Sequence, residues 1–318
     1  MTHDVHATGL WPEEKRPMGV GVMVPRIIGG PNGRDPRFQD VLAIAKATRA
    51  AGFDSLWFGD HFSWVNDDGS IAPRWETFTM MAAIAARVPD IQLGTMVAAT
   101  SYRNSGVTVK TAEALDEISG GRLILGLGAG WNKPEYDQFG FPFDHRASRF
   151  EDAIQIIFPL LREGKAHYQG KWEQANHAVN KPRGPRPGGP PILIGTNGDR
   201  MLGILARYGD AWNSGWVSSL DEIEEPVAKL ERICREHGRD PGTVVKTASV
   251  YFSMRGEGLA GGGTKLFEGN PDERAALMAA FRDRGFGHMI TAFDHCTPET
   301  VTELGASLSL LDAIPASR

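Results

Sequence analysis

The stretch PILIGTNGDRMLGILARYGDAWN, residues 191–213, contains a complete strand–helix–strand pattern. A short apolar run covers Pro191–Gly195, a helical pattern covers Asp199–Tyr208, and a second apolar run covers Asp210–Asn213. Two strands joined by a helix of this length lie parallel in one sheet, with the helix packed on its face. The stretch therefore predicts an α/β fold with a parallel sheet.

The same alternation continues in both directions from this unit, so that eight strands are predicted, each followed by a helical pattern. Eight such units over about 300 residues fit a closed (β/α)8 TIM barrel. The strands cover Met18–Val24, Asp54–Gly59, Ile91–Ala98, Arg122–Leu127, Pro191–Gly195, Asp210–Asn213, Thr243–Phe252 and His288–Phe293. The helices cover Pro36–Ala51, Trp75–Arg87, Val107–Ile118, Asp144–Glu163, Asp199–Tyr208, Leu220–His237, Pro271–Gly285 and Pro298–Leu311.

An open doubly wound sheet is the main alternative, and it usually carries the motif GxGxxG after its first strand. The first predicted strand here ends in VPR, 24–26, without that motif. Residues 1–17 are predicted to be a tail, and 18–318 a single barrel domain with insertion loops. Three loops are expected to cover the mouth of the barrel: Asn66–Trp75, Gly164–Pro190, which has the look of an aromatic hairpin, and Gly256–Asn270.

The 318-residue chain carries a net charge of −5 and contains 38 glycines. A mild negative charge argues against a nucleic-acid-binding protein, which would show a basic patch. The chain has no apolar run long enough for a membrane span, and its N-terminus lacks the apolar core of a secretion signal. Cys234 and Cys296 lie far apart, which favours the reducing cytoplasm. The glycines are expected at turns, helix ends and close backbone approaches.

Active sites of TIM barrels lie where the strands end and the following loops begin. The turn GTNGDR, 195–200, ends one strand and opens a helix. Backbone N–H groups and the helix dipole at such a turn attract an anion, and Arg200 adds a positive charge. The simpler alternative is a helix cap by Thr196 or Asn197 without any ligand.

Two other predicted strand ends carry candidate site residues. The turn GLGAGW, 126–131, would let a phosphate or a flavin ring approach its backbone closely, with Trp131 lining the pocket; alternatively, it is only a tight turn that needs glycine. The segment DHFSW, 60–64, contains His61, which can act as an acid or base near neutral pH. A structural histidine bonded to a backbone carbonyl is the alternative there.

Four stretches together resemble the luciferase-like flavin-dependent oxidoreductases. They are GFDSLWFGDHF (52–62), LGTMV (93–97), LDEISGGRLILGLGAGWNKPEYDQFGFPF (115–143) and the 191–213 stretch quoted first. The resemblance runs from Met18 to Asn213 and continues weakly to the last helix. It implies a TIM barrel with an insertion, and a flavin cofactor, either the deazaflavin F420 or FMN, held at the carboxyl ends of the strands.

This resemblance also implies roles for individual residues. His61 would face the deazaflavin ring as the catalytic residue, and a non-prolyl cis peptide is expected at Met96–Val97, behind the ring. Trp64, Trp216 and Asn104, which stands where relatives have histidine, would surround the substrate. The remaining cofactor contacts would be Gly128, Ala129, Gly130, Trp131, Gly195, Thr196, Asn197, Gly198 and Arg200.

The function that the resemblance implies is F420-dependent hydride transfer to or from a small organic substrate. The alternatives are an FMN-dependent monooxygenase that uses reduced flavin and O2, and a flavin-binding barrel without catalytic activity. A metal-dependent hydrolase using His61, Asp294 and His295 is a third alternative, but HxH and HExxH motifs are lacking and no metal site is expected. The resemblance further implies a homo-oligomer.

Overall fold

The computed structural model describes residues 11–12, 15–24, 35–65, 69–256 and 266–316. Most of the tail predicted over 1–17 lies outside the described residues, and so do parts of two predicted loops, 66–68 and 257–265. In the portion that is described, no helix is long and apolar enough to cross a membrane.

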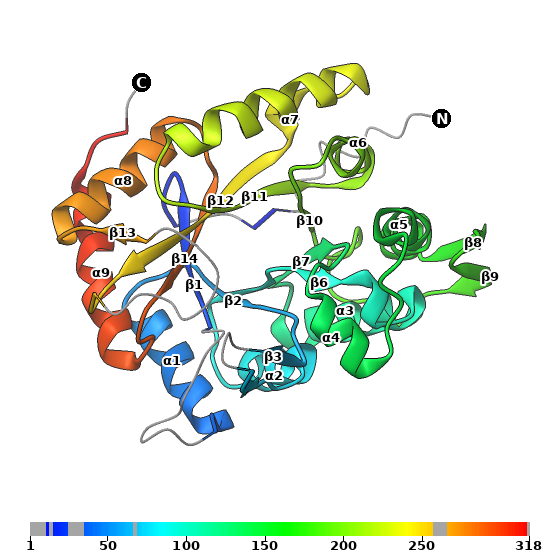
Figure 1. The fold of residues 1–318 in the computed structure, drawn as a ribbon, viewed down its shortest axis with the longest axis horizontal. Coiled ribbons are helices and arrows are strands. Elements are labelled where there is room, and N and C mark those ends of the chain that lie inside the picture. The colour runs from blue at the N-terminus through cyan, green and yellow to red at the C-terminus, as the bar shows by residue number, and fades with distance from the viewer. Residues whose placement is uncertain (1–10, 13–14, 25–34, 66–68, 257–265, 317–318) are drawn as a thin grey trace.

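Eight parallel strands close into a barrel, as the sequence predicts (Figure 1). Each strand pairs with the next one around the barrel, and the last returns to the first, where Gly19 lies beside His288. The strands are β1 (Gly19–Met23), β2 (Ser55–Phe58), β5 (Gln92–Thr95), β7 (Leu123–Gly128), β10 (Ile192–Gly195), β11 (Ala211–Val217), β12 (Val245–Ser253) and β14 (His288–Phe293).

Helices surround the barrel and bury their apolar faces against the outer side of the strands (Figure 1). Local sequence explains several of their ends. Asn270 and Thr297 form capping boxes before the last two helices, and α3 ends at Gly120, whose φ of 67° suits glycine. The main helices are α1 (Phe38–Ala50), α2 (Thr77–Ala85), α3 (Ser105–Ser119), α5 (Arg146–Arg162), α6 (Asp199–Tyr208), α7 (Glu224–Glu236), α8 (Pro271–Asp283) and α9 (Pro298–Ala313).

The strand predicted over Ile91–Ala98 is interrupted. After β5 the chain passes through a cis peptide bond between Met96 and Val97 and resumes as the two-residue strand β6 (Ala98–Ala99), which pairs with β7. The interruption is held by Thr95, whose hydroxyl donates to the Gly126 carbonyl at 2.7 Å and accepts from the Gly126 N–H at 2.9 Å. The expected non-prolyl cis peptide is therefore present at the expected bond.

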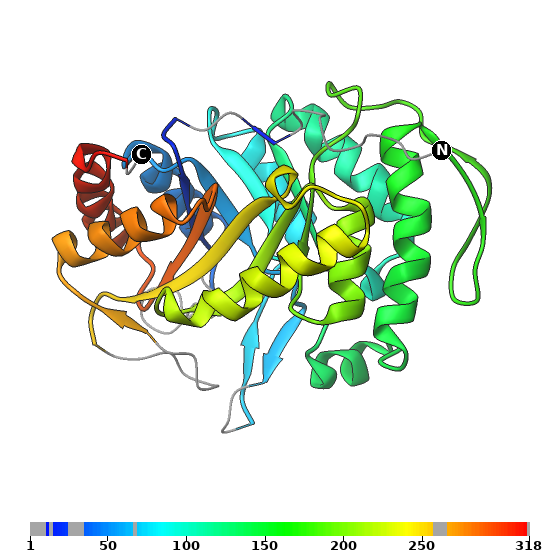
Figure 2. The same cartoon turned by 90° about the horizontal axis from the view of Figure 1, so that it is seen from above.

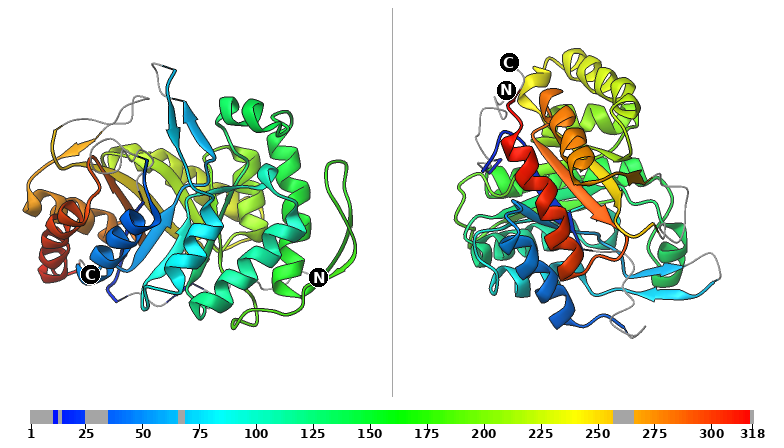
Figure 3. Two further views of the ribbon diagram at one scale, coloured as in Figure 1. Left: turned by 90° about the horizontal axis from the view of Figure 1, so that it is seen from below. Right: turned by 90° about the vertical axis from the view of Figure 1, so that its left-hand side faces the viewer.

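Insertions extend from the barrel. The predicted hairpin in Gly164–Pro190 is confirmed as β8 (Lys165–Gln169) and β9 (Gln174–Val179), which lie beside α5. The sequence prediction missed the hairpin of β3 (Ser63–Val65) and β4 (Ile71–Pro73), and also missed α4 (Lys133–Phe139). Both missed elements extend from the same end of the barrel, where the strands finish (Figures 2 and 3). Short elements complete the fold: η3 (Thr100–Tyr102), η4 (Asp221–Ile223), η5 (Pro241–Thr243) and β13 (Phe267–Glu268).

Trp57 of β2 is fully buried inside the barrel. Its ring needs space that only glycine leaves on the neighbouring strands: a Cβ atom at Gly94 would lie 2.3 Å from the Trp57 ring, and one at Gly21 would lie 2.6 Å from its Nε1. Part of the glycine excess therefore lies within strands, where backbones and a large side chain approach closely, and not only at turns.

We predict that Gly94→Ala lowers the free energy of unfolding by about 2 kcal/mol or more, because an added methyl group overpacks a rigid interior. Gly198→Ala is the matched control, since a Cβ there meets nothing within 4 Å, and it should cost less than about 1 kcal/mol. Urea unfolding of the two variants measures the difference. Equal stability of the two would contradict the packing explanation.

Candidate active site

A cavity of about 270 Å³ lies at the carboxyl ends of four adjacent strands. It brings together His61 after β2, Met96–Val97 after β5, Gly128–Trp131 after β7, and Gly195–Thr196 after β10. The other lining residues are Asp60, Ala99, Tyr102 and Met201. Most of the residues predicted to contact a cofactor thus meet in one place.

The Val97 side chain explains two of the glycines around this cavity. A Cβ atom at Gly128 would lie 2.5 Å from Val97 Cγ2, and one at Gly195 would lie 3.1 Å from Val97 Cγ1. The strand ends of β7 and β10 can therefore close around Val97 only because both positions lack a side chain. The backbone at these turns is left open to the cavity.

His61 is held by Glu135, a fully buried carboxylate of α4. Its Nδ1 lies 2.8 Å from Glu135 Oε2, which also accepts the Tyr102 hydroxyl at 2.9 Å and the Asn132 side chain at 3.1 Å. The other oxygen, Oε1, accepts the backbone N–H groups of Phe62 and Ser63. One carboxylate therefore fixes the backbone and the side chain of the turn that follows β2.

The charge of Glu135 determines which ring nitrogen of His61 carries the proton. Burial acts to raise the pKa of the Glu135 carboxyl, but the hydrogen bond and charge of His61 and the N–H groups of Phe62 and Ser63 lower it overall. Burial and the Glu135 charge raise the pKa of Tyr102, so that its hydroxyl stays a donor. An ionised acceptor requires a proton on His61 Nδ1, which leaves Nε2 for the cavity.

The sequence analysis missed the role of Glu135. This residue lies in the short α4, in the GWNKPEY segment directly after the GLGAG turn. The available signal was a lone acidic residue in the first turn of a seven-residue helix, just after Pro134. That signal does not reveal a partner that is distant in sequence.

Two tryptophans flank His61. Its ring lies edge-on to Trp64 at a centroid distance of 5.4 Å and to Trp131 at 6.0 Å, and the two indoles are 5.6 Å apart. Trp131 is one of the exposed large apolar side chains. The three rings form an aromatic rim in which the imidazole is shielded on two sides.

Asp60 connects the strand end of β2 to the segment after the cis peptide. The buried carboxylate accepts the Ala99 N–H at 3.1 Å and pairs with both terminal nitrogens of Arg103, at 2.7 and 2.9 Å. Arg103 also contacts Glu76 at 2.7 Å. This network fixes the geometry of the cavity wall without contributing a mobile group.

A second cleft, of about 400 Å³, shares Ala129 and Gly130 with the first. It includes Arg200 and the first turn of α5, which begins at Arg146 with no side-chain cap. The free N–H groups of an uncapped helix start attract an anion. Arg146 donates to the Gly130 carbonyl at 3.1 Å, so a second positive charge lies at this cleft. The start of α5 was not among the site residues predicted from the sequence.

The GTNGDR turn contributes Gly195 and Thr196 to the first cavity and Arg200 to the second cleft. Several of its side chains also bond other parts of the protein. The Thr196 hydroxyl accepts the Gly198 N–H at 3.2 Å, and Asn197 donates to the Ser214 carbonyl at 2.7 Å. Arg200 donates to Ser148 at 3.0 Å and pairs with Glu151 at 2.7 Å. Gly198 is the N-cap of α6 and provides no side-chain cap. The helix cap by Thr196 or Asn197 is therefore wrong, because no side chain caps α6, and anion binding at this turn stays a prediction.

Asn104 and Trp216 were predicted to line a substrate pocket. The structure does not bring Asn104 to the cavity, because its side chain accepts the N–H groups of Gly106 and Val107 and caps α3. α3 begins two residues earlier than predicted, and this makes Asn104 a capping residue. Trp216 stacks on Tyr251 at 3.9 Å and packs against the apolar cluster that also carries Met96 and Val97.

The hydrolase alternative receives no support from Asp294. Its carboxylate accepts the backbone N–H groups of Met254 and Arg255, so it organises a loop. Within the described ranges, no three His, Cys, Asp or Glu side chains are grouped as a metal site would require.

The family model of the luciferase-like monooxygenases matches residues 18–257, and the chain belongs to this family. The 5,10-methylenetetrahydromethanopterin reductase of Archaeoglobus fulgidus is 31% identical over 177 residues, 55% of this chain and 49% of that protein. The F420-dependent hydroxymycolic acid dehydrogenase of Mycobacterium tuberculosis is 29% identical over 224 residues, 68% and 59% of the two chains. The pyrimidine monooxygenase RutA of Escherichia coli is 29% identical over 251 residues, 73% and 64%. These matches thus span between 49% and 64% of the relatives' own lengths.

Solved structures show the same fold. The coenzyme F420-dependent tetrahydromethanopterin reductase of Methanopyrus kandleri superposes with a TM-score of 0.73 at 18% identity, covering 91% of this chain and 97% of that one. The EDTA monooxygenase of Chelativorans sp. BNC1 gives 0.77 at 15% identity, covering 95% and 96%. Family members are thus oxidoreductases and monooxygenases on one barrel.

We predict that Glu135→Gln lowers the free energy of unfolding by about 2–4 kcal/mol at pH 7, because several donors lose a charged acceptor. The folded-state pKa of Glu135 is lowered, so its charge stabilises the fold above the ordinary glutamate pKa of about 4.3 and that contribution fades as the pH falls through the folded value. The gap between wild type and variant should shrink below that pH. Urea unfolding across the pH range measures it.

Glu268→Gln, at an exposed position, makes the same chemical change as a control and should leave stability unchanged at every pH. A gap for Glu135→Gln that stays constant down to pH values well below 4 would show that the carboxylate is not the source of the stabilisation.

Proposed function

We propose that this protein is an oxidoreductase that uses the deazaflavin F420 to transfer hydride to or from a small organic substrate. The observation that carries the proposal is the His61–Glu135 pair beside the cis peptide Met96–Val97. It presents an imidazole to a cavity that is built largely from glycine-rich turns. The similarity to an F420-dependent hydroxymycolic acid dehydrogenase, 29% identical, adds support.

The donor set of the two clefts fits a phosphate-bearing flavin. A ring would lie in the first cavity, where Gly128 and Gly195 leave the backbone open, and a phosphate would lie at the second cleft. There the uncapped start of α5, Arg146 and Arg200 would meet it, with the GTNGDR turn adding N–H groups of α6. When bound, the deazaflavin would supply the carbon that accepts or donates the hydride.

The protein's own residues handle the proton that accompanies this hydride. Oxidation of an alcohol, for example, releases a proton from oxygen as hydride leaves carbon, and His61 Nε2 is the group proposed to receive it. Glu135 stabilises the imidazolium that forms, because it accepts the Nδ1–H. Trp64 and Trp131 flank the imidazole and limit access of water to the reacting atoms.

An FMN-dependent monooxygenase is the second candidate, and the similarity to a pyrimidine monooxygenase favours it. A barrel that binds flavin without turnover would share the same clefts. The proposed partners are thus one flavin and one small substrate. The cytoplasm is the proposed compartment, since both cysteines are free and buried.

We predict that F420 raises the melting temperature of the purified protein and that FMN at the same concentration does not. A ligand at a hundred times its Kd adds about 2.7 kcal/mol to the stability of the folded state. Differential scanning fluorimetry with F420, FMN and riboflavin measures the shift. Stabilisation by FMN alone would reject F420 and favour the monooxygenase.

We predict that His61→Ala lowers turnover by about a hundredfold or more, because it removes the proton acceptor. The Kd for the flavin should change by less than about threefold, well under 1 kcal/mol. His167→Ala, which removes an exposed histidine of β8, is the control and should leave both values unchanged. Unaltered turnover in His61→Ala would exclude the proposed role.

A further inference from the structure

The backbone turn at Ala129 and Gly130 borders both clefts of the candidate site, because each of these residues lines the strand-end cavity and also the second cleft. A bare turn can present either its N–H donors or its carbonyl acceptors to a ligand. An anion is attracted by the N–H groups and repelled by the carbonyl oxygens. The groups that hold the two carbonyls of this turn therefore determine what the clefts can bind.

Side chains from two helices occupy both of these carbonyls. The Tyr136 hydroxyl of α4 donates to the Ala129 carbonyl oxygen at 3.1 Å, and Arg146 of α5 donates to the Gly130 carbonyl oxygen at 3.1 Å. Each acceptor of the turn thus has a partner inside the protein. A ligand in the clefts is left with the opposite side of the turn.

The direction of the Tyr136 hydrogen bond is fixed by a second contact. Ser101 Oγ lies 2.6 Å from Tyr136 Oη. The Ala129 carbonyl can only accept, so Tyr136 donates to it and Ser101 donates to the Tyr136 oxygen. Tyr136 is fully buried, and burial raises the pKa of its hydroxyl, so the hydroxyl keeps its proton. A Cβ atom at Gly130 would lie 1.8 Å from this hydroxyl, which shows how closely the turn lies against it.

The peptide between Ala129 and Gly130 directs its N–H away from Tyr136. Among the described residues the cis peptide bonds are Met96–Val97 and Lys181–Pro182, so this peptide is trans, and its C=O and N–H point in opposite directions. Tyr136 lines neither cleft, whereas the turn lines both. The Gly130 N–H therefore faces the clefts, and within the described part of the chain it has no hydrogen-bond partner.

We propose that Tyr136, held by Ser101, is a positioning residue for flavin binding: it turns the Ala129 carbonyl away from the clefts, so that the Gly130 N–H binds an oxygen of the flavin phosphate. The uncapped start of α5 binds the same phosphate from the other side of the second cleft. Tyr136 itself touches no ligand. This inference rests on the proposed function, because it requires a phosphate-bearing flavin.

Pairs of flavins that differ in the phosphate separate this contact from all others. F420 is compared with its deazariboflavin core, and FMN is compared with riboflavin. Tyr136→Phe should raise the Kd of the phosphate-bearing member about tenfold, as expected for a weakened hydrogen bond to a charged group, and should change the Kd of its phosphate-free partner by less than about threefold. Fluorescence titration of the full chain measures these values. Both ligands are titrated into the same sample, so a loss of folded protein does not alter the ratio of the two Kd values.

Two further variants complete the experiment. Ser101→Ala removes the donor to Tyr136 but leaves the Tyr136–Ala129 bond possible, so it should raise the Kd of the phosphate-bearing flavin about threefold. Tyr208→Phe is the matched control, because it removes a hydroxyl that accepts from Gln155 at 2.6 Å at the end of α6 remote from the GTNGDR turn. It should leave every Kd unchanged.

The outcomes distinguish this role from the proposed function. A Tyr136→Phe variant in which the two Kd values of a pair rise equally, or not at all, would overturn the positioning role while the proposed function stands. If this variant does not fold, an unchanged ratio in Ser101→Ala would overturn the role. Binding of FMN in place of F420 would reject the proposed cofactor, and the FMN–riboflavin pair then tests Tyr136. A wild-type chain that binds neither flavin, or binds it no more tightly than its phosphate-free partner, would overturn both.

Discussion

The pairing of β14 with β1 is the constraint from which the rest of the molecule follows. Because the sheet closes on itself, all eight parallel strands end on one rim, and loops that are far apart in sequence must meet there. This end of the barrel brings residues as far apart as Asp60 and Arg200 to the two neighbouring clefts of the candidate site. Closure also limits the interior volume, where Trp57 packs among other buried side chains and needs glycines on the neighbouring strands.

At the strand ends, one buried carboxylate organises the turn that follows β2. Glu135 has no contact with solvent, yet five donors make its charged form the stable one. This charge assigns the proton of the neutral His61 ring to Nδ1. The aromatic rings around His61 keep that interaction away from bulk water, where it would weaken.

The sequence sufficed for the barrel because strands and helices leave local patterns. The bounds of α6 and β14 were predicted as observed, since each is a short apolar or amphipathic run between clear turn residues. The cis peptide at Met96–Val97 was expected from family resemblance alone, and no residue pattern encodes it. α4 escaped prediction because its seven residues, Lys133–Phe139, are too few to show a period. The Glu135–His61 contact escaped because it joins positions 74 apart, which only the closed barrel brings together.

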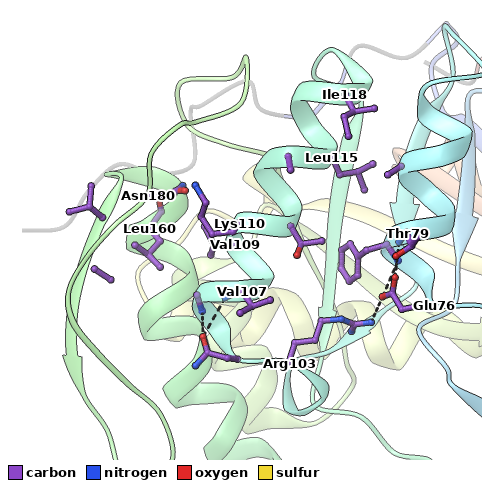
Figure 4. Close-up of a pocket in the computed structure, with 18 residues that line it drawn as sticks. Glu76, Thr79, Arg103, Val107, Val109, Lys110, Leu115, Ile118, Leu160 and Asn180 are labelled. Atoms are coloured by element: carbon purple, nitrogen blue, oxygen red, sulfur yellow. Dashed lines mark hydrogen bonds and ion pairs between the residues drawn. The ribbon is translucent and has the colours of Figure 1, made fainter.

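Arg103 stands between two surfaces that are otherwise separate. One of its terminal nitrogens bonds Glu76, which lines a groove between α2 and α3 on the outside of the barrel (Figure 4). Both terminal nitrogens bond Asp60, which lines the cavity at the strand ends. Arg103 is therefore in direct contact with residues of both surfaces. A substitution of Arg103 would affect the outer groove and the strand-end cavity together. Sequence variation at this one position is therefore constrained by two surfaces at once.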